Sequence, residues 1–497
     1  MPIFVRFVNR IRELENLREV LLADRPALVR VYGRRRLGKT ELLRKLCAEQ
    51  DGLYLLMDEA DPRQQQDSLS DQVARGTGGL RVPFRSWDAF WEYLPKVGKR
   101  FVVLDEFQRV LAIDPLAVSR LQHHWDASFQ HSGPSLVLCG SSVGMMQRLT
   151  TRRSAPLFGR LTGDLRLRPF GYAAVRLLYP GEPEEERVRR YAVFGGTPYY
   201  HTFAVGRKDL FEGIRTAFLE PIAPLVEEPQ NLLRLELKSP SRYNSILLEI
   251  AKGTHGLRGL ESKVGVSQGG LGPYLETLRH DLDLVEMEEP VCGGKKRARY
   301  ILADPFFAFY FRFIFPNRPL LELGSDDQVL DQIKENLNSY VALQFDRIAQ
   351  EALRWINGST WNGVPMDFDQ MGRWWNRSGE EIDLVARGER EVLLGEVKWS
   401  QRAVGMELLQ DLERKSELVE GIGGRPIRFT LISKSGFTPE LLEVAPKRRI
   451  LLLDLEGLSE IFDRTYGKPG GMAPSTPEGS GNGGPEPSKG TIPTSSG

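Results

Sequence analysis

Short apolar runs alternate with longer amphipathic segments through the first third of the chain. The runs are ALVRVY (27–32), LYLLM (53–57), FVVL (101–104) and SLVLC (135–139). Strands of a parallel sheet are buried on both faces and read as continuous apolar runs, whereas the helices between them carry one apolar face. The pattern therefore predicts an α/β domain over residues 1–170, built on a parallel sheet that helices cover.

The strand pattern fades after residue 170. Segments such as EEERVRRYAVF and KDLFEGIRTAFL carry apolar residues at helical spacing, which predicts a helical lid over residues 171–238. Residues 239–305 predict a helix, a short helix, a glycine turn, a second helix (YLETLRH) and two strands, LVEMEEPV and ARYILA. This order of elements predicts a winged helix-turn-helix.

The remainder of the chain divides into three predicted parts. Residues 306–338, which contain most of the Pro- and Phe-rich run DPFFAFYFRFIFPNRP (304–319), are predicted to be a connector. Residues 339–463 again mix helices with strands and predict a second α/β domain. Residues 464–497 are rich in Gly, Pro, Ser and Thr, so they are predicted to be a disordered tail.

Composition narrows the class of protein without identifying it. With 497 residues, of which 41% are hydrophobic and 27% charged, the chain is long enough for several globular domains. Lys and Arg number 67 and Asp and Glu number 66, so no global basic excess indicates nucleic acid or an anionic membrane. Any contact with DNA or RNA must come from local patches.

The cysteines and the N-terminal segment indicate a cytoplasmic protein. Cys47, Cys139 and Cys292 are too few and too far apart for a disulfide framework or a CxxC metal site. Arg6 and Arg10 interrupt the first apolar stretch, which therefore lacks the core of a signal peptide. No window approaches 18 apolar residues, so no membrane span is expected.

The clearest motif is GRRRLGKT, which follows a predicted strand and opens a predicted helix. It matches the phosphate-binding loop G-x-x-x-x-G-K-[ST]. Gly33 and Gly38 let backbone N–H groups face phosphate oxygens, Lys39 reaches the β- and γ-phosphates, and the Thr40 hydroxyl is offered to Mg²⁺. The three arginines inside the loop receive no role from this motif, because the backbone forms the cradle.

Two neighbouring strands supply the rest of a nucleotide site. FVVLDE ends in Asp105, predicted to bind the Mg²⁺, and in Glu106, predicted to orient the attacking water; a solvated pair that ends a strand is the alternative. SLVLCGSS ends in Ser141 and Ser142, which either sense the γ-phosphate or are ordinary turn residues. Arg160 either adds positive charge to the transition state or forms a surface ion pair.

These motifs together resemble a known family. GRRRLGKT, FVVLDEFQ, LCGSS, PLFGRLTGDLRLRPF and FGGTPYY, in this order after FVNRIRELENL, look like the archaeal-type ATPases of archaea and bacteria, within the AAA-related signal-transduction NTPases. The resemblance covers about Phe4 to Leu219. It implies that the nucleotide is ATP and that Gly196 and Pro198 sense the bound base from the lid.

A second set of charged residues lies near the C-terminus, in GEEIDLVARGEREVLLGEVKWS. Glu396 and Lys398 are two apart on a predicted strand and share a face. If the hairpin turns between Glu389 and Arg390, Asp383 lies directly opposite Glu396. Asp383 and Glu396 are then predicted to hold Mg²⁺ while Lys398 steadies a water or phosphate. A solvated face of alternating charge is the alternative.

This region resembles a PD-(D/E)xK nuclease, a restriction-endonuclease-like α/β fold, over about Ser339 to Phe462. It looks like the form that follows the archaeal-type ATPase as a domain of unassigned function. In the preceding helix, LQFDRIAQEALRWI, Asp346 stands where the family usually has Glu. Many members of this fold keep the shape without cutting, so cleavage stays open.

The predicted winged helix carries little excess charge. Residues 241–302 contain nine Lys and Arg against eight Asp and Glu, and the second helix offers Tyr274, Arg279 and His280. Its basic side chains gather at the predicted wing tip, which has Lys295, Lys296, Arg297 and Arg299. They suffice for a few phosphate contacts, and a protein-docking or regulatory role is equally open.

Two functions follow from the sequence. The first is an ATP- and Mg²⁺-dependent ATPase whose nucleotide state controls, through the winged helix, a nuclease-like domain acting on DNA or RNA. The second is an ATP-dependent regulatory switch whose nuclease-like domain only binds. A homo-oligomer is left open. The residues predicted to act in catalysis are Glu106, Arg160, Asp383, Glu396 and Lys398.

Overall fold

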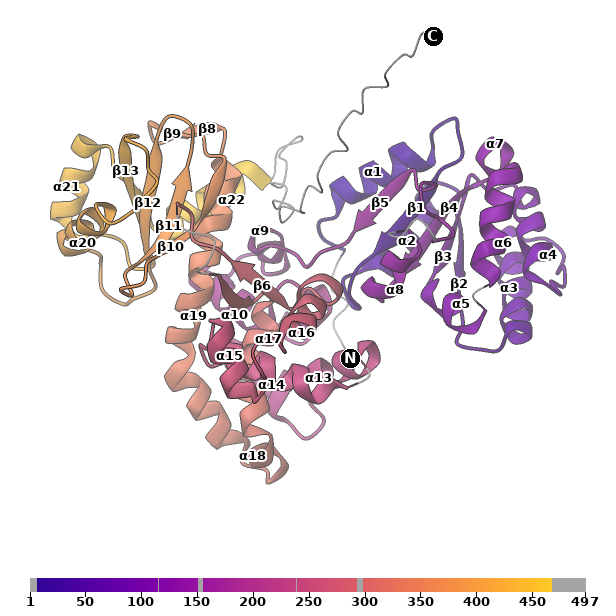
Figure 1. Ribbon diagram of the computed structural model, residues 1–497, viewed down its shortest axis with the longest axis horizontal. Coiled ribbons are helices and arrows are strands. Elements are labelled where there is room, and N and C mark those ends of the chain that lie inside the picture. Colours follow the sequence, from indigo (N-terminus) through magenta and orange to yellow (C-terminus); the bar gives the residue numbers. More distant parts are fainter. Residues whose placement is uncertain (1–6, 115, 151–154, 238, 293–297, 467–497) are drawn as a thin grey trace, which may run out of the picture.

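The computed structural model describes residues 7–114, 116–150, 155–237, 239–292 and 298–466. The predicted disordered tail lies almost wholly in 467–497, outside the described residues, and so do the wing-tip residues Lys295, Lys296 and Arg297. Figure 1 shows the N-terminal domain at one end, the C-terminal sheet at the other, and a group of helices between them. Among the described residues, none of the helices combines the length and apolar character that crossing a membrane requires.

The N-terminal domain is built on a five-stranded sheet in the order β2-β3-β4-β1-β5, with all strands parallel. This confirms the predicted α/β domain with a parallel sheet. Every residue of β1, β3 and β4 is buried, which is why these strands are mostly apolar. The strands are β1 (Leu28–Tyr32), β2 (Leu53–Leu56), β3 (Phe101–Asp105), β4 (Ser135–Gly140) and β5 (Gly163–Arg166).

Helices cover both faces of this sheet. Alternate strand residues point to opposite faces and pack into two separate apolar clusters, one against α1 and α2 and the other against the remaining helices. The principal helices are α1 (Ile11–Leu21), α2 (Lys39–Glu49), α3 (Pro62–Thr77), α4 (Trp87–Tyr93), α5 (Gln108–Ile113), α6 (Leu116–His124) and α8 (Val143–Arg148).

The next part of the chain is helical and ends in a hairpin. The predicted lid contains α9 (Tyr172–Val175), α10 (Glu184–Phe194), α11 (Pro198–His201), α12 (Leu210–Ile214), η4 (Arg215–Leu219) and α13 (Glu228–Glu236). Three helical segments follow, namely α14 (Pro240–Ala251), α15 (Leu257–Val264) and α16 (Gly272–Glu276) continued by η5 (Thr277–Asp281). Strands β6 (Val285–Glu288) and β7 (Arg299–Leu302) then pair antiparallel, and we call them the β6–β7 hairpin.

The predicted connector, residues 306–338, differs from the expectation. It forms α17 (Pro305–Phe309), η7 (Tyr310–Ile314), η8 (Phe315–Asn317), α18 (Arg318–Glu322) and the first part of the 31-residue α19 (Asp326–Ile356). Its aromatic side chains are buried in one apolar core that runs from Phe170 to Phe462. The expected boundary between residues 338 and 339 falls inside α19. The segment is therefore the centre of a core, because large aromatic side chains are buried rather than left on a surface link.

The C-terminal domain contains a second five-stranded sheet in the order β10-β11-β12-β13-β14 (Figure 1). The first three strands are antiparallel and the last three parallel. Helices α19 and α22 (Leu455–Tyr466) pack on one face, and α20 (Met406–Ser416) and α21 (Pro439–Arg448) on the other. The strands are β10 (Gln370–Trp375), β11 (Glu381–Arg387), β12 (Val392–Lys398), β13 (Ile427–Ser433) and β14 (Leu451–Leu453), with a separate pair β8 (Ser359–Trp361) and β9 (Val364–Met366).

The β11–β12 hairpin has the predicted register. Leu384 pairs with Gly395 and Arg387 with Val392, so the next position along places residue 383 opposite residue 396.

Candidate functional site

The loop between β1 and α2 has the backbone of a phosphate-binding loop. Gly33 has φ +154°, and a Cβ there would lie 2.3 Å from the carbonyl oxygen of Leu167. Gly38 has φ +87° and is the N-cap of α2. Both positions therefore need glycine. The loop presents the first turn of α2, whose N–H groups have no helical partner and attract anions.

Lys39 is buried at this turn and folds back onto its own loop. Its Nζ donates to the carbonyl oxygens of Gly33 at 2.7 Å and Arg34 at 2.8 Å. Burial lowers the pKa of Lys39, against the charges of Asp105 and Glu106, which raise it. The ammonium is thus held beside the loop by two neutral oxygens, which phosphate oxygens can replace.

Asp105 lies fully buried at the end of β3, directly beside the loop. Its Oδ2 accepts from the Thr40 hydroxyl at 2.7 Å and from the Tyr54 hydroxyl at 2.6 Å. Burial alone would raise the pKa of Asp105, but hydrogen bonds from Cys139, Tyr54 and Thr40 outweigh it and lower this pKa. The ionised carboxylate and the Thr40 hydroxyl are hard oxygen donors that fit Mg²⁺. Tyr54 and Cys139 were not predicted from the sequence.

Glu106 follows with φ +55°, a left-handed conformation that costs a non-glycine residue free energy. Its Oε2 accepts from the Ser141 hydroxyl at 2.8 Å and from the Gln108 side chain. Gln108 also donates to Ser141 at 3.1 Å. Ser142 instead donates to Glu236 of α13 at 2.9 Å. Of the two serines, Ser141 therefore lies at the site, and Gln108 is a member that the sequence did not single out.

The arginines of the loop connect it to distant parts of the chain. Arg34 pairs with Asp304 before α17, and both side chains are buried. Arg36 pairs with Glu228 of α13 at 2.8 Å and lies over the Tyr199 ring at 4.0 Å. The arginines to which the motif gave no role thus join the loop to the lid and the central core.

A small cavity lies beside the loop and is shared with the lid. Burial raises the pKa of Glu236, while the charges of Arg35 and Lys39 lower it. The cavity is lined by Arg34, Arg35, Ser141, Val143, Leu232, Glu236, Asp281 and Leu282.

Two further predicted residues have different surroundings. Arg160 forms a two-point ion pair with Asp126, with Nε to Oδ1 at 2.7 Å and Nη2 to Oδ2 at 2.6 Å. In this structure Arg160 has the ion pair given as its alternative, and its role in the transition state stays a prediction. Pro198 begins α11, and the preceding Gly196 lies so close to Phe170 that a Cβ would be 2.0 Å from the Phe170 carbonyl oxygen.

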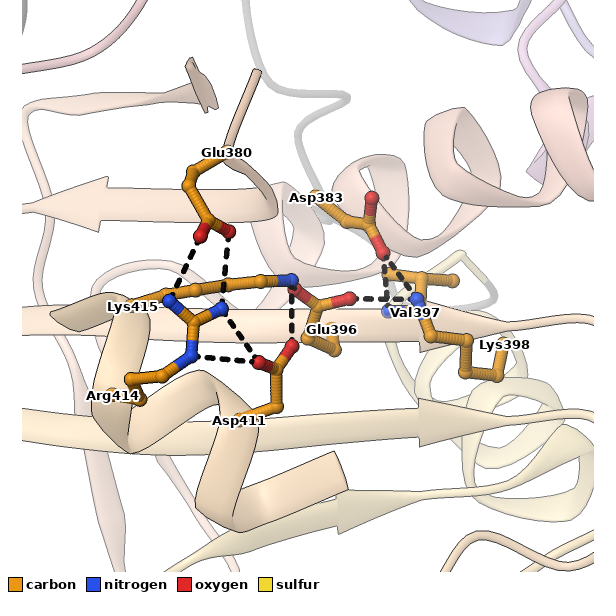
Figure 2. A network of polar contacts seen from close by, with 8 residues as sticks. All are labelled: Glu380, Asp383, Glu396, Val397, Lys398, Asp411, Arg414 and Lys415. Carbon is orange, nitrogen blue, oxygen red and sulfur yellow. Dashed lines mark hydrogen bonds and ion pairs between the residues drawn. The ribbon is translucent and has the colours of Figure 1, made fainter. Parts of the chain in front are cut away.

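The three charged residues of the C-terminal hairpin come together, as Figure 2 shows. Lys398 Nζ donates to Glu396 Oε2 at 2.6 Å and to Asp383 Oδ2 at 3.1 Å, and the Val397 N–H also donates to Asp383. Burial and the Asp383 charge raise the pKa of Glu396. Burial would raise the pKa of Asp383, but Lys398 outweighs it, so this pKa is lowered.

A second lysine completes this cluster. Lys415 of α20 donates to Glu396 Oε1 at 2.9 Å and pairs with Asp411 at 3.0 Å (Figure 2). Glu396 is only 2% exposed, so both of its oxygens are neutralised in a place that water hardly reaches. Lys415 was not predicted, because it lies 19 residues from Glu396 along the chain. The sequence pattern of its helix indicates which side is apolar, but not which residue a polar side chain contacts.

Asp346 of α19 lies next to the same cluster. It pairs with Arg373 of β10 at 2.5 Å. Burial and the Asp383 charge nevertheless raise the pKa of Asp346 to about 8. The structure thus brings a third carboxylate close to Asp383, with an arginine as its partner.

The predicted metal role of Asp383 and Glu396 rests on two carboxylates. Within the described ranges, no group of three or more His, Cys, Asp and Glu side chains is arranged to hold a metal ion. Two carboxylates still fit Mg²⁺, which keeps several waters and takes further oxygens from a phosphate. A groove beside Lys398 is lined by Ser400, Arg402, Ala403, Val404, Glu407, Leu408 and Asp411.

Comparison with known proteins agrees with the geometry of the first site. Residues 7–201 match the family described as an ATPase domain predominantly from Archaea, and residues 310–413 match a family of archaeal and bacterial proteins of unknown function. An uncharacterized protein of Methanocaldococcus jannaschii is 30% identical over 468 residues, spanning 91% of this chain and 100% of the relative. This chain belongs to the archaeal-type ATPase family. It is a P-loop ATPase by its domain and by the geometry around Lys39 and Asp105.

Solved structures similar to this archaeal-type ATPase include two archaeal nucleotide-binding proteins. A Walker-type ATPase of Pyrococcus abyssi is 20% identical, with a TM-score of 0.46 over 62% of this chain and 96% of that chain. The ORC2 protein of Aeropyrum pernix, in ADPNP and ADP complexes, is 17% identical, with a TM-score of 0.43 over 67% of this chain and 97% of that chain.

Proposed function

We propose that this archaeal-type ATPase hydrolyses ATP with Mg²⁺, and that its nucleotide state controls a nuclease-like C-terminal domain acting on DNA or RNA. The observation that carries the first part is the Thr40 to Asp105 hydrogen bond beside Lys39, at the loop that opens α2. Lys39 exchanges its two carbonyl partners for the β- and γ-phosphates. Thr40 and Asp105 hold the Mg²⁺, which would offset phosphate charge when bound.

Glu106 is the proposed base in this reaction. Ser141 and Gln108 fix its carboxylate, so it can orient a water and accept its proton. Ser141, directly after the adjacent strand β4, then senses the γ-phosphate. Pro198 contacts the base of the nucleotide from the lid, as the family resemblance implies.

Two substitutions, Lys39→Ala and Glu106→Gln, test the proposed ATPase, and a third tests the role of Arg160. Lys39→Ala removes the ammonium that replaces water around the phosphates, so tight ATP binding should be lost in an equilibrium titration. Glu106→Gln keeps the shape and the Ser141 contact, so binding should persist while turnover falls by about a hundredfold or more. Arg160→Ala distinguishes a transition-state arginine, which slows turnover, from an ion pair, which leaves it unchanged. Normal hydrolysis in both Lys39→Ala and Glu106→Gln would refute the assignment.

The second part of the proposal rests on the C-terminal cluster and on the hairpin before it. Three helical segments followed by an antiparallel hairpin support a winged helix. Asp383, Glu396 and Lys398 converge as a PD-(D/E)xK site requires. There Asp383 and Glu396 would hold Mg²⁺, and Lys398 would steady the attacking water or the developing phosphate charge.

One observation favours a second candidate, a regulatory switch whose C-terminal domain only binds nucleic acid or a partner. Lys398 pairs with both Asp383 and Glu396, Lys415 pairs with Glu396, and Arg373 pairs with Asp346. Each carboxylate of this cluster therefore has a cationic side chain of the protein as its partner.

Cleavage assays separate the two candidates. Plasmid and single-stranded DNA or RNA are incubated with Mg²⁺ or Mn²⁺, with and without ATP. A nuclease should lose cleavage in Asp383→Ala and show altered cleavage in Lys39→Ala, whereas the neighbouring Asp411→Ala should cleave. No cleavage of any substrate, with ATP turnover intact, would establish the switch instead.

A further inference from the structure

The β6–β7 hairpin contacts β10, the edge strand of the C-terminal sheet, just after β6. Val291 follows β6, and its N–H donates to the carbonyl oxygen of Arg373 in β10 at 2.8 Å. A Cβ on Gly372 would lie 3.0 Å from a Val291 methyl group, so glycine permits this approach. The pairing of β10 with β11 shifts between Gly372 and Trp374, which makes Arg373 the irregular residue of the strand. The hairpin therefore holds the backbone of Arg373, the residue whose side chain pairs with Asp346.

A second contact fixes the other strand of the hairpin. Arg299 of β7 pairs with Glu381 of β11 at 2.9 Å and lies over the Trp375 ring at 4.3 Å. Glu381 in turn lies 4.0 Å from Arg373. Arg299 was predicted to contact nucleic-acid phosphate from the wing, but here its charge is committed to the C-terminal domain.

The opposite end of the hairpin leads directly to the nucleotide site. Asp281, at the end of η5, lines the cavity beside the phosphate loop together with Arg35 and Ser141. Asp283 pairs with Arg166 of β5 at 2.6 Å. Strand β6 begins at residue 285, so only a short segment separates the cavity from the hairpin.

We propose that the β6–β7 hairpin is a latch through which ATP regulates the C-terminal carboxylate cluster. This inference rests on the proposed function, because it names the regulation of that same site. When docked, the latch keeps Arg373 on Asp346 and so withdraws one carboxylate from Asp383. ATP phosphates repel the acidic groups Glu236 and Asp281 of the cavity, which displaces η5 and pulls the hairpin off β10.

A disulfide can lock the latch, because Cys292 directly follows Val291. A Cβ on Gly421 would lie 3.9 Å from the Cys292 Cβ, within the range of disulfides. Gly424→Cys is the matched control: Gly424 has a similar φ, +71° against +84°, but a Cβ there meets no atom within 4 Å. In full-length Gly421→Cys protein, the oxidised form should bind a non-hydrolysable ATP analogue at least about fivefold more weakly than the reduced form. The control should show no redox effect.

Hydrogen exchange gives a readout that is independent of cleavage. ATP should increase exchange of the Val291 amide, which donates to Arg373, in the reduced protein and leave it unchanged in the oxidised Gly421→Cys protein. Arg299→Ala weakens docking without a crosslink, so it should bind ATP more tightly than the wild type.

Each unfavourable result is informative. Failure of the disulfide to form in folded, oxidised protein contradicts the docked position. Equal ATP affinity of the locked and reduced forms, with exchange unaffected by ATP, overturns the latch. Loss of ATP binding in every form refutes the proposed ATPase itself, whereas absence of cleavage leaves these measurements intact.

Discussion

At the scale of single residues, the buried charged side chains of the nucleotide site have neutral hydrogen-bond partners that a bound nucleotide can replace. Lys39 is held by two carbonyl oxygens and Asp105 by hydroxyl groups, and both sets of partners can be exchanged. Asp346 differs, because its Arg373 partner does not overcome burial and the nearby Asp383 charge. A buried charge that is only partly compensated makes stability depend on its protonation.

Asp346 should therefore make the protein less stable as the pH rises. Its pKa is about 8 in the folded protein and about 3.9 in an unfolded chain, so between these values the folded state holds a proton that the unfolded state has lost. The stabilisation is complete below pH 4 and is lost as the pH rises through 8. The free energy of unfolding of the wild type, relative to Asp346→Asn, should fall by up to about 1.4 kcal/mol per pH unit in this window. Urea denaturation at several pH values measures this slope.

Asp331→Asn is the control for this measurement. Asp331 lies on the same helix, α19, but is exposed and pairs only with Lys334 of the next turn. Its substitution should leave the pH slope as it is in the wild type. If the free energy of unfolding changes with pH equally in the wild type and in Asp346→Asn, the charge of Arg373 fully compensates the burial of the Asp346 carboxylate.

At the scale of helices and strands, the sequence predicted what depends on local pattern. The parallel strands β1 to β4 and the phosphate loop could be predicted because most strand residues are apolar and the loop motif has fixed spacing. The register of β11 with β12 followed from the turn position alone. Thr40 contacts Asp105, and Lys398 contacts Asp383 and Glu396, whereas the roles of these residues stay predictions.

Elements were missed or misjudged where tertiary contacts decide the structure. Strand β5 is a half-exposed edge strand with the polar sequence GDLR, so no apolar run marks it. The aromatic segment 305–314 is apolar on all sides and interrupted by a π-turn, which destroys the 3.6-residue period of a surface helix. Lys415 and Arg373 acquire their roles only from distant partners, Glu396 and Asp346, which no local pattern connects.

At the scale of the whole molecule, the apolar cores divide the chain differently from the predicted domains. The N-terminal sheet has its own two clusters, whereas the predicted lid, the hairpin region, α19 and one face of the C-terminal sheet share a single core. Polar contacts between these two bodies include Arg34 with Asp304 and Arg36 with Glu228. The apolar side chains of the lid thus belong to the C-terminal core rather than to that of the ATPase sheet, and Glu228 of the lid pairs with Arg36 of the phosphate loop.

Calorimetry of the full-length protein should show this division as two unfolding transitions. ATP with Mg²⁺ binds the loop of the N-terminal sheet and should raise the transition temperature of that body by mass action.

Tyr340→Phe should instead lower the temperature of the other transition by about 2 °C or more. The buried Tyr340 hydroxyl lies 2.7 Å from the Pro305 carbonyl oxygen and 2.9 Å from that of Ala192, so its loss leaves the junction of α19, α17 and α10 without this hydrogen bond. In the control, Tyr243→Phe, the half-buried ring packs against Tyr274 and both transitions should remain in place. One cooperative transition, or a Tyr340→Phe effect on both, would mean that the polar ties unite the two bodies.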